Sequence, residues 1–308
     1  MEIAVLIPCY NEELTISKVI ENFNSSLPMA KVYVYDNNST DQTKVVAAKC
    51  GAITKSENQQ GKGHVVRRMF RDIEADFYVL VDGDDTYDAT IASDMVSIAV
   101  EDQCDFVNAV RTNDPKDAYR VGHKMGNKLL TGSVRLLFGN RIEDMLSGYK
   151  VLSRRFIKSF PSLSTGFEIE TELAVHALIL GIPIAHVYGN YGGRPAGSSS
   201  KLRTYRDGIR ILSLIVNLFK SERPMTFFGM LGLILLIASL CTAFPIIMTY
   251  LQTGLVPRVP TAILSVGIML SAFLSFTSGL ILDTVTRGRR EARMLQYLAI
   301  NSQSVGMR

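Results

Sequence analysis

The sequence predicts an α/β domain with a mainly parallel sheet, followed by an amphipathic helix and two membrane-spanning helices. Over roughly the first 110 residues, short β-branched runs alternate with polar, helix-compatible stretches, which is the pattern of βαβ units. Farther along the chain, residues 225–251 and 261–282 carry no charged side chain. Each segment exceeds the roughly 20 apolar residues that cross a bilayer. The alternative, two buried helices of a large core, fits such lengths poorly.

The elements of the α/β domain follow in chain order. We expect strands at residues 3–7, 31–35, 77–81 and 105–110, and helices at residues 12–24, 41–48, 64–73 and 91–100. A helix at 122–138, a short strand at 148–152 and a helix at 168–180 come next. Helix-start signals support two of these helices, because Asn11 precedes Glu12 and Glu13, and Ser39 or Thr40 can cap the helix at Asp41.

Composition divides the chain into four regions. They are the α/β domain at 1–203, an amphipathic interfacial helix at 204–224, two membrane-spanning helices within 225–283 (about 225–251 and 261–283), and a basic tail at 284–308. In the amphipathic region, polar residues such as Arg206 and Arg210 recur at gaps of four and three on an apolar helix. Such a helix is expected in the membrane interface, and the alternative is a core helix of the soluble domain.

Charge indicates a membrane partner. The net charge is only +4, the hydrophobic fraction is 47% and the mean hydropathy is +0.16. Basic residues flank the two uncharged segments, whereas the loop between them carries Arg258 alone. The positive-inside rule therefore predicts a multi-pass protein of the cytoplasmic (inner) membrane with both termini and the α/β domain in the cytoplasm. Anionic lipid headgroups are the expected partner, and no nucleic acid is expected.

Two carboxylates, Asp82 and Asp84, follow the predicted strand at 77–81. At the carboxyl end of a strand such a pair can hold a hard cation and leave positions open for diphosphate oxygens. We therefore expect Mg²⁺ or Mn²⁺ at Asp84, with Asp82 nearby. The alternative is an acidic turn, because Asp-Gly pairs are common in turns.

Three further loops are expected to converge on this pair, because parallel strands end at the same edge of a sheet. They read IPCYNEE (7–13), YDNNSTDQT (35–43) and NQQGKGH (58–64). Asp36 can accept hydrogen bonds from a base or ribose. Gly61 and Gly63, on either side of Lys62, allow a backbone turn near phosphate.

The order of these four motifs resembles the family-2 glycosyltransferases, whose donor domain runs P-x-Y-N-E, D-D-G-S-T-D, G-K-G or G-x-G, then D-x-D. Within that family the layout is similar to the polyprenyl-phosphate glycosyltransferases, the dolichyl-phosphate mannose synthases and their bacterial relatives. The later motifs that carry the resemblance are YRVGHKMGNKLLTG (119–132), SGYKVLSRRF (147–156), GFEIETEL (166–173) and GRPAGSSSK (193–201). The sequence departs from the family pattern at Asn37 and Asn38, where Asp and Gly are usual, and at Lys150, where many members have Arg.

The resemblance implies a GT-A (Rossmann-like) fold and assigns roles to residues of the loops. The donor-binding set is Pro8, Tyr10, Asn11, Glu12, Asp36, Asn38, Lys62, Gly63, Asp82, Gly83 and Asp84. The acceptor-phosphate set is Arg111, Arg120, Lys124, Asn127, Arg194, Ser200 and Lys201. Asp82, Asp84, Arg111 and Arg194 are the expected catalytic residues. One of Glu168, Glu170 and Glu172 orients the sugar or the acceptor, unless all three are plain helix-surface carboxylates.

The activity that the resemblance implies is inverting transfer of a hexose or N-acetylhexosamine. The donor is a UDP- or GDP-sugar, and the acceptor is undecaprenyl or dolichyl phosphate. A phosphate monoester is already anionic near neutral pH, so placement and charge stabilisation are expected to dominate over base catalysis. One alternative is a processive polysaccharide synthase, which usually carries a Trp that this chain lacks. Another is a non-catalytic membrane scaffold or flipping component. A homo-oligomer through the membrane helices is possible.

Overall fold

The computed structural model describes residues 1–112, 121–195, 197 and 204–301, with the side chains of 121–128 and 204–205 left out. The chain forms two compact units. Unit 1 comprises Met1–Ile215 together with the residues from Arg293 onward, and unit 2 comprises Val216–Ala292.

Unit 1 is built on a seven-stranded sheet of order β3-β2-β1-β4-β6-β5-β7. The strands are β1 (Ile3–Cys9), β2 (Lys31–Asp36), β3 (Ile53–Ser56), β4 (Phe77–Leu80), β5 (Phe106–Thr112), β6 (Lys150–Ser153) and β7 (Ile184–Asn190). Neighbours pair in parallel except at β6, which runs antiparallel to both β4 and β5. The expected mainly parallel sheet is confirmed. β3 and β7 were not anticipated, because neither of these half-exposed edge strands has a continuous apolar run.

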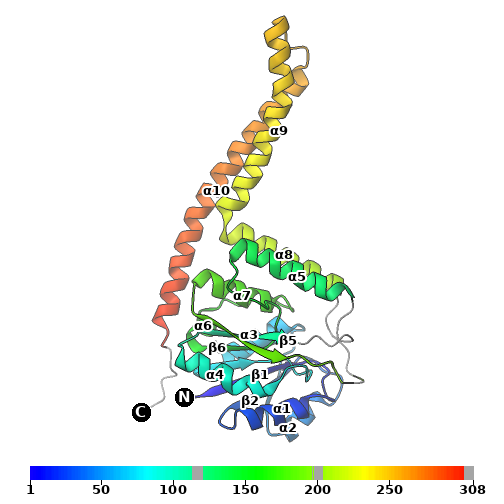
Figure 1. The fold of residues 1–308 in the computed structure, drawn as a ribbon, viewed down its shortest axis with the longest axis vertical. Helices are drawn as coiled ribbons and strands as arrows, with labels where there is room; N and C mark the ends of the chain where they lie inside the picture. Colours follow the sequence, from blue (N-terminus) through cyan, green and yellow to red (C-terminus); the bar gives the residue numbers. More distant parts are fainter. Residues whose placement is uncertain (113–120, 196, 198–203, 302–308) are drawn as a thin grey trace. The chain divides into compact units, whose positions relative to one another are not determined.

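In chain order, the helices as far as residue 222 are α1 (Ile16–Ser26), α2 (Thr43–Lys49), α3 (Lys62–Asp72), α4 (Ala92–Glu101), α5 (Val121–Phe138), α6 (Arg154–Ser159), α7 (Ile169–Leu180) and α8 (Thr204–Glu222). α1, α2 and α4 lie on one face, and α3, α6 and α7 lie on the other (Figure 1). α1 begins four residues later than expected, because Asn11 takes a left-handed backbone conformation with φ of 53° and keeps Glu12 in a loop.

The core follows from the alternation of side chains along β1. Ile3, Val5 and Ile7 point to one face, where they pack with Ile16 and Ile20 of α1 in a single cluster of buried side chains. A side chain of this size stabilises the fold by about 1.5–3 kcal/mol when fully buried. β1 and β4 are thereby fixed at the centre of the sheet, with the loops that follow them at its carboxyl edge.

Unit 2 consists of the end of α8 and a helical hairpin. α9 (Pro224–Thr253) and most of α10 (Val259–Ala299) run side by side (Figure 1). Both helices are long and apolar enough to cross a membrane, with mean hydropathies of 2.5 and 1.9 over their most apolar windows. The two helices pack closely at Gly232 of α9, which faces the ring of Phe276 of α10. The hydroxyl of Ser239 in α9 donates a hydrogen bond to the Ser265 carbonyl in α10 at 2.8 Å.

Candidate active site

A cavity of about 400 Å³ opens at the carboxyl ends of β1 and β4. Eight of the residues predicted from the motifs line it: Pro8, Tyr10, Glu12, Lys62, Asp82, Gly83, Asp84 and Arg194. They come from three separate loops and from the start of α3, so the sheet brings together residues that lie far apart in the sequence. Asn37 of the second motif lines the cavity as well, so the expected convergence of the four motifs holds in the structure.

Asp84 and Glu12 share one cation in this cavity. The Arg194 guanidinium lies 2.5 Å from Asp84 Oδ2 and 3.6 Å from Glu12 Oε1. Asp84 is only 4% exposed, and its other oxygen accepts a hydrogen bond from the Thr86 hydroxyl at 2.6 Å. Two buried carboxylates therefore converge on a single positive group at the wall of the cavity.

Asp82 has a different partner. Its Oδ1 accepts from the Lys62 ammonium at 2.6 Å, and its Oδ2 is close to the backbone of Gly148. A Cβ atom at Gly148 would lie 2.2 Å from that oxygen, so only glycine allows the strand leading into β6 to come this near. Asp82 is thus fixed from two sides, and its side chain keeps 30% of its surface exposed.

Lys62 also contacts Glu170, at 2.7 Å from Oε1, and the second oxygen of Glu170 lies 2.5 Å from the Lys150 ammonium. Burial alone would raise the pKa of Glu170, but the two ammonium groups outweigh burial and hold that pKa below its usual value. Burial likewise works against the charge on Lys62, yet Asp82 and Glu170 raise its pKa above the usual value. The Lys62 ammonium and the Glu170 carboxylate are therefore both ionised at neutral pH.

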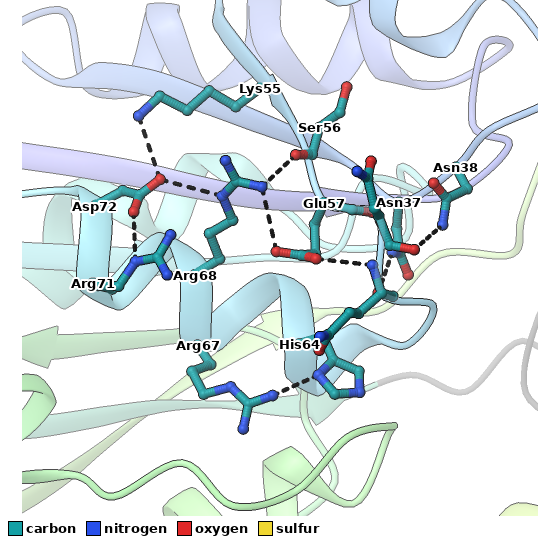
Figure 2. A network of polar contacts seen from close by, with 12 residues as sticks. Asn37, Asn38, Lys55, Ser56, Glu57, His64, Arg67, Arg68, Arg71 and Asp72 are labelled. Atoms are coloured by element: carbon teal, nitrogen blue, oxygen red, sulfur yellow. Dashed lines mark hydrogen bonds and ion pairs between the residues drawn. The ribbon is translucent and has the colours of Figure 1, made fainter.

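The departures from the family pattern at Asn37 and Asn38 have structural explanations. The Asn37 amide donates to the carbonyls of Glu57 and Gln59, at 2.9 and 2.7 Å, and its oxygen accepts from the Gly61 N–H at 2.7 Å. A carboxylate has no N–H to donate, so Asp could not anchor this loop in the same way. Asn38 has φ of 63°, a conformation that Asn tolerates better than most residues. Figure 2 shows both side chains beside the loop that they organise.

The same loop packs against a second one. A Cβ atom at Gly61 would lie 2.2 Å from the Thr165 carbonyl oxygen, and one at Gly63 would lie 2.3 Å from that of Ser164. The two glycines around Lys62 therefore allow close backbone packing. Gly61 also has φ of 135° and lines the cavity, and the expected turn near phosphate stays a prediction.

The three glutamates of the GFEIETEL motif have separate tasks. Glu172 accepts from the N–H groups of Leu163 and Ser164, and Glu168 accepts from that of Gly166. These two carboxylates shape the loop that packs on Gly61 and Gly63. Glu170 and Glu172 are buried, at 4% and 6% exposure, so the alternative of three plain surface carboxylates is wrong.

Several predicted residues do not line the cavity. Asn11, Asp36, Asn38, Gly63 and Arg111 are absent from its wall. Asp36 is buried at the end of β2, where it accepts from the Ser39 N–H at 3.2 Å. Arg111 forms a two-pronged pair with Asp144 at 2.7 and 2.8 Å and stacks over the ring of Tyr191.

Other predicted acceptor residues fall outside the described part of the chain. Arg120, Ser200 and Lys201 lie in the segments that the structure leaves out, and the side chains of Lys124 and Asn127 are not described either. Their roles stay predictions.

Three residues of α8 also line the cavity: Arg206, Asp207 and Arg210. The sequence predicts that Arg206 and Arg210 face headgroups and water. Their four-residue spacing places them on one face of the helix and both are exposed, and their placement at a membrane stays a prediction. Phe167, in the loop before α7, is another lining residue that the sequence did not single out.

The residues of the cavity fit a divalent cation that is completed by a ligand. Among the described residues, no group of three or more His, Cys, Asp or Glu side chains is placed to hold a metal by itself. Mg²⁺-type sites, however, commonly use one or two carboxylates together with substrate phosphates. Glu12 and Asp84 already converge on one cation, the guanidinium of Arg194, and supply hard oxygen ligands.

The sequence is similar to those of known proteins over much of its length. A model of Glycosyl transferase family 2 matches residues 4–160. The chain is 34% identical over 232 residues to glycosyltransferase AglJ of Haloferax volcanii, which covers 75% of this chain and 76% of the relative. It is 25% identical over 223 residues to a dolichyl-phosphate hexose transferase of the same organism, covering 72% of this chain and 96% of that one.

Solved structures share the fold. The glucosyl-3-phosphoglycerate synthase of Mycobacterium tuberculosis, in complex with Mn²⁺, uridine-diphosphate-glucose and phosphoglyceric acid, aligns with a TM-score of 0.56 at 20% identity. The alignment covers 71% of this chain and 79% of that one. The GT-A fold expected from the sequence is thereby confirmed, and with the family match and the relatives above, the chain belongs to glycosyl transferase family 2.

Proposed function

We propose that this glycosyltransferase moves a sugar from a nucleotide-sugar donor to a polyprenyl phosphate, with inversion at the anomeric carbon. One observation carries the proposal: the acidic and cationic groups of a family-2 domain line one cavity, and the same chain continues into two helices of membrane-spanning length. Two membrane-spanning helices would hold the domain at the membrane, where a lipid-borne acceptor is accessible.

The nucleotide-sugar donor is proposed to bind in the cavity through three of its lining residues. Asp84 and Glu12 would hold Mg²⁺ or Mn²⁺, and Lys62 would contact a diphosphate oxygen. When bound, the metal supplies positive charge that offsets the charge of the departing nucleoside diphosphate. A UDP-sugar is the favoured donor over a GDP-sugar, in line with the uridine nucleotide held by the structural neighbour.

The acceptor side requires cations that align a phosphate monoester. Arg194 lines the cavity and presents a planar fork suited to phosphate, and the other predicted acceptor residues would complete the site. One phosphate oxygen attacks the anomeric carbon, the bond from that carbon to the diphosphate breaks, and the electron pair leaves with the nucleoside diphosphate. The attacking oxygen carries no proton near neutral pH, so no side chain has to remove one.

The membrane side of the proposal places the α/β domain and both termini in the cytoplasm. Arg287, Arg289, Arg290 and Arg293 follow the apolar part of α10, and Lys220 and Arg223 precede α9. These charges support a cytoplasmic orientation. The dolichyl-phosphate hexose transferase among the relatives supports a polyprenyl phosphate as the acceptor.

A partition assay tests the proposal. Purified protein with Mn²⁺ is given radiolabelled UDP- and GDP-sugars and either undecaprenyl phosphate or phosphoglyceric acid. We expect label in the organic phase with undecaprenyl phosphate and no transfer to phosphoglyceric acid. We also expect Asp84→Ala to lower the transfer rate by about 100-fold or more, on the scale of lost transition-state charge stabilisation. Label that never enters the lipid with any donor, or full activity of Asp84→Ala, would reject it.

A further inference from the structure

Four charged side chains form a continuous chain of contacts from the core of unit 1 to the cavity. In order they are Lys150, Glu170, Lys62 and Asp82, joined by contacts of 2.5, 2.7 and 2.6 Å. The exposed fraction of the side chain rises along this series, from 0% at Lys150 through 5% and 8% to 30% at Asp82. The charges alternate in sign, so the four ionised groups together carry no net charge. The series reaches solvent at Asp82, in the cavity wall.

Lys62 is the member of this series that can contact a ligand. An ammonium group has three N–H donors. Asp82 Oδ1 accepts one of them, and Glu170 Oε1 lies 2.7 Å from the nitrogen as an ion pair without a hydrogen bond. Among the contacts of the described residues, an N–H therefore remains for an anion in the cavity that Lys62 lines. A lysine side chain has several rotatable bonds, so the direction of that N–H depends on the two carboxylates that hold the ammonium.

Glu170 lies too deep to contact a ligand itself. It is 4% exposed and is not part of the cavity wall. Its first oxygen binds Lys62, and its second binds Lys150, whose ammonium also donates to the Ser147 carbonyl. Lys150 is thus fixed to the backbone just before β6, and it fixes Glu170 in turn.

We propose that Glu170 is a positioning residue of the donor site, held by Lys150, which sets the place of the Lys62 ammonium against Asp82 and the donor diphosphate. A preformed cation avoids the ordering cost that a free lysine side chain would incur when the donor binds. The competing explanation is a buried ion pair with a structural role alone, in which Lys62 would stay beside Asp82 without Glu170.

Crystal structures without ligand separate these two explanations. In Glu170→Gln we expect the Lys62 ammonium to lose its contact with Asp82 Oδ1, because its second anchor is now neutral. Glu170→Asp keeps the charge but shortens the side chain, and it serves as a second variant if Glu170→Gln does not fold. An ammonium that remains within hydrogen-bond distance of Asp82 in the variant overturns the proposal.

Nucleotide binding gives a second readout, which rests on the proposed function. Isothermal titration with UDP, in the presence and absence of Mn²⁺, is expected to show about tenfold weaker binding for Glu170→Gln, on the scale of one charge-assisted hydrogen bond. Lys62→Met should weaken binding to a similar extent, and the double variant should be no weaker than Lys62→Met alone, because Glu170 acts through Lys62.

The control is Asp105→Asn, which removes another buried, ion-paired carboxylate of the same domain that is remote from the cavity wall. It should lower thermal stability and bind UDP like the wild type. The positioning role would be overturned if Glu170→Gln bound UDP as tightly as the wild type. It would also be overturned if the losses of UDP affinity in Lys62→Met and Glu170→Gln multiplied in the double variant. A wild-type protein that binds neither UDP nor GDP contradicts the proposed function instead. The position of the Lys62 ammonium in the ligand-free crystals of the wild type and Glu170→Gln then still tests the positioning role.

Discussion

The guanidinium of Arg194 lies 2.5 Å from the carboxylate of Asp84, at the site where the sequence predicts a divalent cation. It lies 3.6 Å from Glu12 as well. One arginine therefore contacts two carboxylates that are 4% and 7% exposed, and it offsets one of their two negative charges. A metal that binds these carboxylates competes with the arginine, because two cations in so small a space repel each other.

This competition gives the first prediction. Arg194→Ala should bind Mn²⁺ more tightly than the wild type, by roughly tenfold or about 1.4 kcal/mol, and should transfer sugar more slowly because the acceptor phosphate loses a cation. Electron paramagnetic resonance of free Mn²⁺ during a titration measures the affinity. Arg194→Lys, which keeps the charge, is the control and should stay near the wild-type affinity. Weaker Mn²⁺ binding in Arg194→Ala would speak against a metal at Asp84.

The second prediction concerns the backbone beside Asp82. Gly148→Ala places a methyl group 2.2 Å from Asp82 Oδ2, so the carboxylate has to shift. We expect a transfer rate at least tenfold lower, measured in the partition assay. The matched control is Gly132→Ala, where no described atom outside the adjacent helix backbone lies within 4 Å of the new Cβ and helix α5 should gain about 0.5–1 kcal/mol. Equal activity of the two variants would show that the position of Asp82 does not matter.

The third prediction is a pH dependence of stability that depends on His176. Its ring lies between Phe156 and Phe160, and burial, with a smaller effect of the Arg293 charge, lowers its pKa to about 3. The unfolded chain takes up the proton near pH 6.5 and the folded chain does not. The free energy of unfolding should therefore fall as pH drops from 6.5 toward 3, by about 2 kcal/mol between pH 6.5 and 5.

Thermal denaturation in detergent over this pH range measures the effect. His186, whose pKa is also lowered by burial, contributes in the same direction, so the comparison must be made between variants. In His176→Phe the apolar packing is kept and the titrating group is gone, and the pH dependence between 6.5 and 5 should be shallower. A curve parallel to that of the wild type would contradict the assignment.

The fourth prediction concerns the end of α10. The Tyr297 hydroxyl donates to Asp105 Oδ2 at 2.5 Å, and the Arg155 guanidinium stacks 5.1 Å from the centre of the tyrosine ring. Asp105 is 1% exposed, so loss of this donor should cost about 1–3 kcal/mol. We expect Tyr297→Phe to melt at a lower temperature and to be cleaved faster by protease after Arg293, with transfer activity at permissive temperature retained. An unchanged melting temperature would mean that the contact contributes nothing.

The fold was largely predictable because its signals are local. β1, β2 and β4 are short apolar runs that end in polar loops, and the two long uncharged segments fit the alternative of buried core helices poorly. β6 was found as a strand, but its antiparallel direction could not be read from its sequence. The direction of a strand depends on the edge at which the chain enters the sheet. The burial pattern of the four residues of β6 is compatible with a parallel or an antiparallel strand.

The lining of the cavity was predictable where a motif follows a central strand, as at Asp82 and Asp84 after β4. The site was not predictable where the function of a side chain depends on its partner. Glu168, Glu170 and Glu172 share one motif, yet among the described side chains it is Glu170 alone that contacts two lysines. Arg206 and Arg210 show helical spacing, but that spacing does not reveal that their face of α8 borders the cavity.

A crystal structure of the protein with UDP and Mn²⁺ tests the central claim most directly. We expect Mn²⁺ to bind Asp84, the diphosphate to lie in the cavity beside Lys62, and Arg194 to have left Asp84 for the side where the acceptor phosphate enters. A nucleotide bound outside this cavity, or a metal that does not touch Asp84, would contradict it.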